Sequence, residues 1–190
     1  MFHFFAYIAR MRAIRRWGLM DSHLPENVAE HTLMTAVLAH ALAVIAQELG
    51  EEDADPNGCA AAALFHDAPE ILTGDLPTPV KYFSAGIRDA YRAVEEAGAE
   101  KLLSTLPESY RAAYRALLKP EDARIERIVS AADKLSAYIK CLEELRSGNT
   151  EFRDAARATR EKLDAMDMPE LRVFFEKFLP SFSLTLDAMR

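Results

Sequence analysis

A histidine and an aspartate stand side by side at the end of an alanine-rich apolar run. His66 and Asp67 follow the segment CAAAALF, and Glu70 comes one helical turn after His66. Asp75 then opens a loop that contains two prolines. Such polar groups are poor core material, whereas imidazole and carboxylate are ligands for metals such as zinc, manganese and cobalt. The pair therefore indicates a site for chemistry.

Two further residues of the same types occur in segments with helical patterns. In chain order the four candidate metal ligands are His31, His66, Asp67 and Asp133. Four such ligands would leave positions open for water and a phosphate oxygen. Taken singly, each has a simpler interpretation. A histidine on an apolar helix face is usually a hydrogen-bonded core residue, and Asp133 alone would be a solvated residue paired with Lys134 or Lys140.

Helix geometry restricts how the adjacent pair can act on one ion. His66 and Asp67 would be about one hundred degrees apart on a continuous helix, so they do not share a face. They converge only if the helix ends or kinks there. The following segment LTGDLPTPV is too rich in glycine and proline for regular structure, which makes a helix end plausible. We expect this loop to be rigid.

The elements around these residues are all predicted to be helical. No strand pattern competes, and residues 1–190 are expected to form a single compact domain of the all-α class. Helices are expected at 3–15, 28–50, 56–66, 83–105, 107–118, 122–147, 151–166 and 169–188, with Pro180 breaking the last.

The helix expected at 28–50 has two apolar stripes at helical spacing. One consists of His31, Met34, Leu38, Ala41, Ile45 and Leu49, and the other of Leu33, Val37, His40 and Val44. Apolar residues on both sides predict a central, buried helix. The helix at 122–147 has a single apolar face: Ile125, Ile128, Val129, Ala132, Leu135, Ile139 and Leu142. Asp133 lies at the border of that face.

Composition excludes several function classes. The net charge of −7 argues against a nucleic-acid polymer as partner, because duplex binding usually requires a basic face. No apolar run reaches the ~20 residues that span a bilayer, so no membrane is expected. Cys59 and Cys141 form no CxxC motif and are predicted to be buried free thiols in a reducing cytoplasm. The apolar, basic start is expected to be a packed first helix.

The order His31, His66-Asp67, Asp133 resembles the H…HD…D signature of HD-domain metal-dependent phosphohydrolases. Within that superfamily, the segments RWGLM, ENVAEHT, HDAPEILTGDLPTPVKYF, ADKLSAYIKCLEEL and FLPSF resemble the bacterial 5′-deoxynucleotidases. The resemblance runs from Arg16 to Phe182. Gly18 stands where that family has proline, and Ala29 where it has serine; neither position is a proposed ligand.

The resemblance implies an HD-domain helical bundle that hydrolyses deoxyribonucleoside 5′-monophosphates. It implies one divalent metal ion (Co, Mn or Zn) on the four ligands, and a cytoplasmic homodimer. Glu70 is not needed as a ligand, so it could orient or deprotonate the attacking water as the catalytic residue. Asp75 could assist the leaving 5′-oxygen or hold the sugar. A surface glutamate at a helix end is the alternative for Glu70.

The resemblance also implies a set of substrate contacts: Arg16, Trp17, Asp67, Asp75, Leu76, Pro77 and Thr78. The guanidinium of Arg16 offers a fork for phosphate. Trp17, the only tryptophan, would flank the sugar and leave no space for a 2′-hydroxyl. Simple packing of a cation and a ring at a helix end is the alternative for these two residues.

Two other functions remain open at this stage. An HD phosphohydrolase could act on nucleoside triphosphates or alarmone-type nucleotides, which usually require several additional basic residues. None occurs between Asp67 and Lys81, which counts mildly against such substrates. The second of these hypotheses is a non-catalytic helical interaction protein with a vestigial metal site. The presence of Glu70 and Asp75 argues against it.

Overall fold

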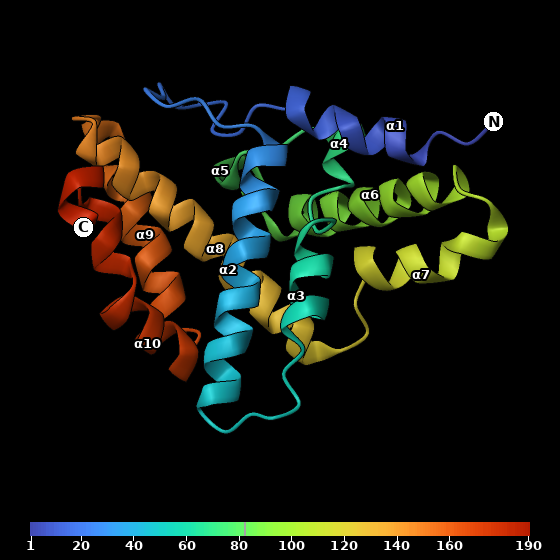
Figure 1. Cartoon of the computed structure of the whole chain (residues 1–190). Helices are drawn as coiled ribbons and strands as arrows, with labels where there is room; N and C mark the ends of the chain where they lie inside the picture. Colours follow the sequence, from blue (N-terminus) through green and yellow to red (C-terminus); the bar gives the residue numbers. More distant parts are fainter. Residues whose placement is uncertain (82) are drawn as a thin grey trace.

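The computed structural model describes residues 1–81 and 83–190, and their regular structure is helical. The β-type pairing within these ranges is one isolated antiparallel bridge between Arg15 and Asn27. Figure 1 shows α2 and α3 side by side at the centre, α9 and α10 on one side and α6 and α7 on the other. The predicted all-α class is confirmed.

The helices have the following bounds. The α-helices are α1 (Phe4–Ile8), α2 (Val28–Glu48), α3 (Pro56–Ala63), α4 (Glu70–Thr73), α5 (Thr78–Lys81), α6 (Ala85–Ser104), α7 (Glu108–Leu118), α8 (Ala123–Arg146), α9 (Arg153–Asp164) and α10 (Pro169–Lys177). The 3₁₀ helices are η1 (Ala9–Ala13), η2 (Thr150–Phe152), η3 (Leu179–Ser183) and η4 (Leu186–Met189). The first predicted helix is thus divided into an α part and a 3₁₀ part, and the last into one α part and two 3₁₀ parts.

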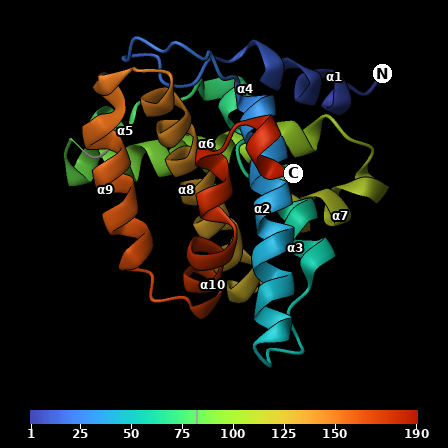
Figure 2. The same ribbon diagram turned by 60° about the vertical axis from the view of Figure 1, so that its left-hand side comes forward.

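The start of α2 is fixed by a capping box. The Asn27 side chain accepts from the Glu30 backbone N–H at 3.0 Å, and the Glu30 carboxylate accepts from the Asn27 N–H at 3.1 Å. Two of the N–H groups that a helix start leaves unpaired are satisfied in this way. The buried face of α2 packs on α3, α8 and α10, as the turned view in Figure 2 also shows. His31 lies in the first turn of this well-anchored helix.

One face of α2 contradicts the expected burial. Leu33, Val37 and Val44 are exposed, with 59%, 55% and 37% of their surface accessible, and His40 is exposed as well. The prediction of a helix buried on both sides is therefore wrong. By length and composition α2 could cross a membrane, but 56% of its most apolar stretch of 18 residues is buried inside the molecule, as in the core helix of a globular protein.

The segment that carries the His-Asp pair leaves the helix earlier than predicted. Asp55 caps α3 by accepting from Gly58 N–H at 2.9 Å, and α3 ends at Ala63, three residues before His66. Residues 64–69 form turns before α4 begins. The expectation that LTGDLPTPV has no regular structure is corrected, because α4 and α5 each contribute one short helical turn there.

The middle of α8 forms the other side of the core. Its predicted apolar face is largely buried, including Ile128, Leu135 and Ile139, and it packs on α2 and α3. The main core cluster combines residues of α2, α3, α8 and α10. Asp133 therefore projects from a helix that packing holds in place against the helix of His31.

A buried carboxylate near the end of α8 fixes the loop that precedes α2. Glu144 accepts from the backbone N–H of His23 at 3.0 Å and of Leu24 at 2.9 Å. It also pairs with Lys140 and accepts from the amide of Asn149 at 2.9 Å. Glu144 is fully buried, so these partners are needed to offset the cost of removing its charge from water. The loop is tied to the bundle through one side chain.

Both cysteines are buried free thiols, as predicted. Burial raises the pKa of Cys59 to about 11 and that of Cys141 to about 12. A thiol reacts mainly as thiolate, so neither residue is a nucleophile at neutral pH.

Candidate active site

The four predicted ligands converge on one point. His31 Nε2 lies 3.1 Å from Asp133 Oδ1 and 3.6 Å from Asp67 Oδ2. His66 Nε2 lies 3.2 Å from Asp67 Oδ2 and 4.0 Å from Asp133 Oδ1. The ligand atoms of His31, His66 and Asp133 all lie within 4.8 Å of one another. This spacing suits one cation between imidazole nitrogens and carboxylate oxygens.

Asp133 does not form the lysine pair that its helix pattern suggests. Its carboxylate contacts His31, whereas Lys134 bonds to Ser130 and Lys140 bonds to Glu144. Three elements thus meet at the site: the first turn of α2, the turns after α3 and the middle of α8. The end of α3 at Ala63, before the His-Asp pair, is what allows both neighbours to face the same point.

Hydrogen bonds on the far side of each imidazole free the nitrogen that faces the site. His31 Nδ1 lies 3.2 Å from Ser136 Oγ, and His66 Nδ1 lies 2.7 Å from the carbonyl oxygen of Ala63. A carbonyl only accepts, so His66 donates through Nδ1 and its Nε2 faces the site. Among the described residues that buried Nε2 has no hydrogen-bond partner. Such an orphaned imidazole nitrogen, with its ring held from behind, fits a metal ligand.

The electrostatics of the cluster favour positive charge at its centre. Burial lowers the pKa of His66, but the negative charges of the adjacent Asp67 and of Asp133 outweigh it and raise that pKa to about 9. Burial raises the pKa of Asp67, yet His66 and His31 bring it below its usual value. The pKa of Asp133 is lowered in the same way by His31. The two carboxylates are therefore ionised and available to a cation.

Glu70 is a buried carboxyl at the edge of this cluster. It is the first residue of α4, is only 8% exposed, and its Oε2 has no hydrogen-bond partner among the described residues. Burial and the negative charges of Asp67 and Asp75 raise its pKa to about 9, against the opposing charge of Arg16. The interpretation of Glu70 as an exposed helix-end glutamate is wrong. Its position is that of a group able to exchange a proton beside the cation site.

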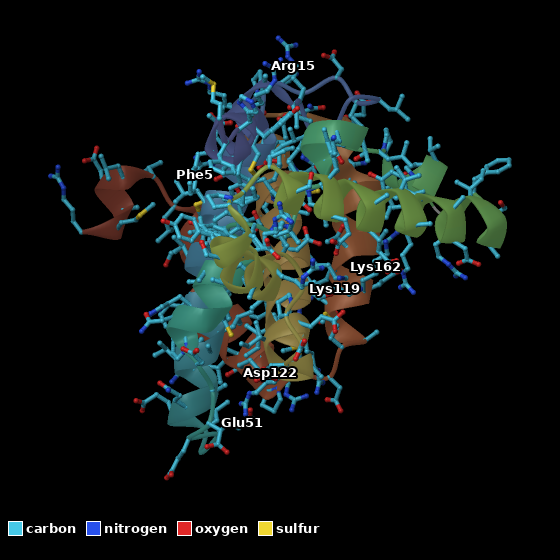
Figure 3. All side chains as sticks on the ribbon, turned by 90° about the vertical axis from the view of Figure 1, so that its right-hand side faces the viewer. Phe5, Arg15, Glu51, Lys119, Asp122 and Lys162 are labelled. Carbon is cyan, nitrogen blue, oxygen red and sulfur yellow. The ribbon has the colours of Figure 1, made fainter. Side chains whose placement is uncertain are left out.

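Arg16 joins the cluster from the segment before α2. Its Nη1 lies 3.4 Å from Asp67 Oδ2 and its Nε donates to Glu26 at 3.1 Å. Burial alone would lower the pKa of Arg16, but Asp67, Asp133 and other carboxylates raise it. The neighbouring Arg15 points outward, away from the bundle (Figure 3). Of the two arginines, only Arg16 is directed at the ligands.

Trp17 lies beside Arg16 with its ring held between protein groups. Its indole N–H donates to Glu26 at 3.0 Å, and its ring centroid lies 5.1 Å from that of Phe152. Trp17 remains half-buried, so part of the side chain is accessible. Arg16 thus contacts the ligand Asp67, and Trp17 lies next to Arg16 on the same glutamate.

The loop after α4 brings Asp75 toward the same place. Burial raises the pKa of Asp75, while Arg16 and the backbone N–H of Trp17 act in the opposite direction, so these groups are neighbours. Leu76 and Pro77 are half-buried, and Thr78 is exposed at the start of α5. Gly74, with φ of +74°, provides the turn from α4 into this loop.

A pocket of about 500 Å³ adjoins the cluster, lined on one side by His66, Asp67 and Glu70. Helices α6 and α7 form its opposite wall, where Arg92, Arg115 and Lys119 are the basic residues; Glu100 pairs with Arg115 and Glu96 with Lys119. The volume is sufficient for a mononucleotide. The sequence did not predict these three basic residues as part of the site, because nothing in their local pattern shows that α6 and α7 fold back over it.

Comparison with known proteins places the chain in a family. A family model described as 5′-deoxynucleotidase YfbR-like matches residues 3–182. A protein named 5′-deoxynucleotidase from Photobacterium profundum is 44% identical, over 97% of this chain and 96% of its own length. Vibrio parahaemolyticus has a 5′-deoxynucleotidase that is 46% identical, over 97% and 96% of the two chains.

Solved structures agree on the fold. An HD-domain phosphohydrolase from Listeria innocua superposes with a TM-score of 0.83 at 22% identity, covering 98% of this chain and 91% of the other. An HD phosphohydrolase of cyanophage S-2L, bound to dA and one catalytic Zn²⁺ ion, has a TM-score of 0.67 at 22% identity, covering 93% and 96%. These likenesses establish the HD-domain fold, and the sequence matches establish that the chain belongs to the YfbR-like 5′-deoxynucleotidase family.

Proposed function

We propose that this protein hydrolyses deoxyribonucleoside 5′-monophosphates to a deoxynucleoside and phosphate, with one divalent metal ion held by four side chains. The ligands are His31, His66, Asp67 and Asp133. The observation that carries this proposal is their convergence within hydrogen-bonding distances, with Arg16 directed at the same point. The family membership of the chain supports the substrate class.

The metal centre fits a divalent cation of the Co, Mn or Zn type. Two neutral imidazoles and two ionised carboxylates satisfy such a metal and leave open coordination positions. A divalent ion there polarises the phosphate and lowers the pKa of a coordinated water from ~15.7 toward ~7. The catalytic Zn²⁺ of the cyanophage phosphohydrolase, which has the same fold, supports a divalent metal in this protein.

In the proposed reaction water attacks phosphorus, the bond between phosphorus and the 5′-oxygen breaks, and the leaving oxygen takes up one proton, which balances the one that the attacking water releases. Glu70 accepts the proton of the attacking water, for which it must be ionised. Burial and the negative charges of Asp67 and Asp75 raise the pKa of Glu70. Positive charge next to Asp67 and Asp75 would offset those two charges and so favour the ionised form of Glu70. Asp75 faces the leaving 5′-oxygen or the sugar.

Substrate recognition is assigned to two groups of residues. Arg16 donates to the phosphate oxygens, which the planar guanidinium matches in a fork geometry. Trp17 flanks C2′ of the sugar and excludes a 2′-hydroxyl. Asp67 and the loop formed by Asp75, Leu76, Pro77 and Thr78 complete the contacts with the nucleotide.

The proposal extends to assembly and location: residues 1–190 act as one domain, in a cytoplasmic homodimer. The core cluster shared by α2, α3, α8 and α10 supports one domain. The exposed apolar stripe on α2, formed by Leu33, Val37 and Val44, supports a second copy as partner. The two buried free thiols support a reducing compartment.

Phosphate release from a panel of matched deoxy- and ribonucleoside monophosphates tests the proposed function. The metal-loaded protein should hydrolyse the deoxyribonucleoside 5′-monophosphates with the higher kcat/KM, and 3′-monophosphates and triphosphates should be poor substrates. Rates on triphosphates equal to those on monophosphates would favour the alternative hypothesis of an HD phosphohydrolase that acts on nucleoside triphosphates. No phosphate release from any monophosphate with Co, Mn or Zn would contradict the proposal.

A further inference from the structure

Glu26 makes two side-chain contacts that the proposed chemistry does not use. One of its carboxylate oxygens, Oε2, accepts from both Trp17 Nε1 at 3.0 Å and Arg16 Nε at 3.1 Å. The side chains involved are largely enclosed, with 14% of Glu26 and 12% of Arg16 exposed. A single carboxylate therefore holds the two residues assigned to sugar and phosphate recognition.

The backbone brings this carboxylate to the right place. The segment 15–27 leaves the bundle and returns antiparallel to itself: Arg16 N–H donates to Glu26 C=O at 3.0 Å, and Val28 N–H donates to Ile14 C=O at 3.0 Å. Glu26 is thus fixed opposite Arg16 just before the capped start of α2. At the far end of the same segment, the Asp21 N–H donates to the exposed Glu151 carboxylate at 3.3 Å.

The backbone of Trp17 is strained, so contacts from other residues must keep it in place. Its φ is +60°, in the left-handed region that bulky residues rarely adopt. The Met20 N–H donates to the Trp17 carbonyl at 2.9 Å, and Phe152 covers one side of the ring. The hydrogen bond to Glu26 adds a directional contact at the indole N–H, which packing against Phe152 does not supply.

Arg16 is oriented by the same interaction. With Nε on Glu26, the guanidinium plane directs Nη1 at Asp67, 3.4 Å away. If the contact with Glu26 were lost, the long side chain would regain its rotamers and could turn away from the site.

We propose that Glu26 is a positioning residue that sets sugar selectivity and phosphate binding through Trp17 and Arg16. This inference rests on the proposed 5′-deoxynucleotidase function for its kinetic readout. In Glu26→Gln, the amide oxygen can still take the place of Oε2, but it is neutral, so both contacts lose the strength that the carboxylate charge gives them. Removing the charge from these hydrogen bonds corresponds to about tenfold in kcat/KM.

The test compares Glu26→Gln with Glu151→Gln, a matched change at the far end of the same segment. For each variant we measure kcat/KM for a deoxy and a ribo monophosphate of one base, bound metal by elemental analysis, and fluorescence of Trp17. Because Trp17 is the only tryptophan, its emission reports the indole environment directly. Glu26→Gln should lower the deoxy-to-ribo ratio, raise KM and increase acrylamide quenching, with unchanged metal content. Glu151→Gln should match the wild type.

Two results would overturn the inference: an unchanged selectivity ratio in folded Glu26→Gln, or wild-type quenching of Trp17. If wild-type protein hydrolyses no monophosphate, the proposed function fails, while the fluorescence comparison still decides whether Glu26 holds the indole. Should Glu26→Gln not fold, Trp17→Phe removes the indole N–H from the same contact and must lower the ratio. If it does not, selectivity does not pass through this hydrogen bond.

Discussion

Replacing Glu70 by glutamine should slow the reaction and stabilise the metal-free protein at neutral pH. The folded protein keeps this buried carboxyl neutral up to about pH 9, whereas 4.5 is the ordinary value that applies when it is solvated. Between these values the folded state holds a proton that the unfolded state has released. Stability of the metal-free wild type therefore falls as the pH rises through that window. Glutamine cannot ionise and removes this dependence.

The size of the effect follows from the same pKa values. From the ordinary pKa of 4.5 to pH 7 is about 2.5 pH units, each worth about 1.4 kcal/mol, so Glu70→Gln should stabilise the metal-free protein by about 3 kcal/mol at pH 7. The difference should be small at pH 4.5 and larger at pH 8. In the metal-loaded enzyme, kcat should fall by ~10²–10⁴-fold, the usual worth of general acid–base help.

Urea unfolding of the chelator-treated proteins at several pH values measures the stability difference, and phosphate release measures kcat. Glu108→Gln, which removes an exposed carboxylate at the start of α7, is the control for losing one acidic group. Parallel pH dependences of wild type and Glu70→Gln would refute the reasoning about the buried carboxyl. Loss of metal from Glu70→Gln would instead make Glu70 a ligand.

Three other predictions concern the ligands and their supports. Asp67→Ala should abolish hydrolysis in a folded protein, and near-wild-type phosphate release with metal added back would exclude Asp67 as ligand. Ser136→Ala should weaken metal binding by about 10–100-fold because the His31 ring loses its support; unchanged affinity in calorimetry would count against it. Glu144→Gln should destabilise the fold by ~3–5 kcal/mol, because Lys140 stays buried without its partner. The pKa of Glu144 is lowered, so its contribution to stability is present above the ordinary glutamate pKa of 4.5 and is lost in acid. Below about pH 4.5 the stability of the variant should therefore change less than that of wild type.

The sequence alone predicted the four side chains that the structure brings together, and the main geometric condition for their convergence. The neighbours His66 and Asp67 cannot face one ion from within a continuous helix, so a helix end or a kink was expected at this pair. The structure places that end at Ala63, a few residues earlier than the apolar pattern indicated. Helix boundaries depend on competition between local hydrogen bonds and packing, which periodicity does not record.

Other features could not be read from the sequence because they depend on what lies opposite a residue in space. The exposed stripe of α2 has the same spacing as a buried one, and only the number of neighbouring helices decides between them. Glu26 follows a proline in a polar loop and looks like an ordinary surface acid. Its contacts with Arg16 and Trp17 arise because the chain turns back on itself before α2.

Titration of metal into the chelator-treated protein, followed by phosphate release from a deoxyribonucleoside 5′-monophosphate, tests the central claim most directly. Activity should be absent at first, return with Co, Mn or Zn, and saturate at one equivalent per chain. Full activity in the chelated protein, or a rise that continues to two or more equivalents, would contradict a single metal centre on His31, His66, Asp67 and Asp133.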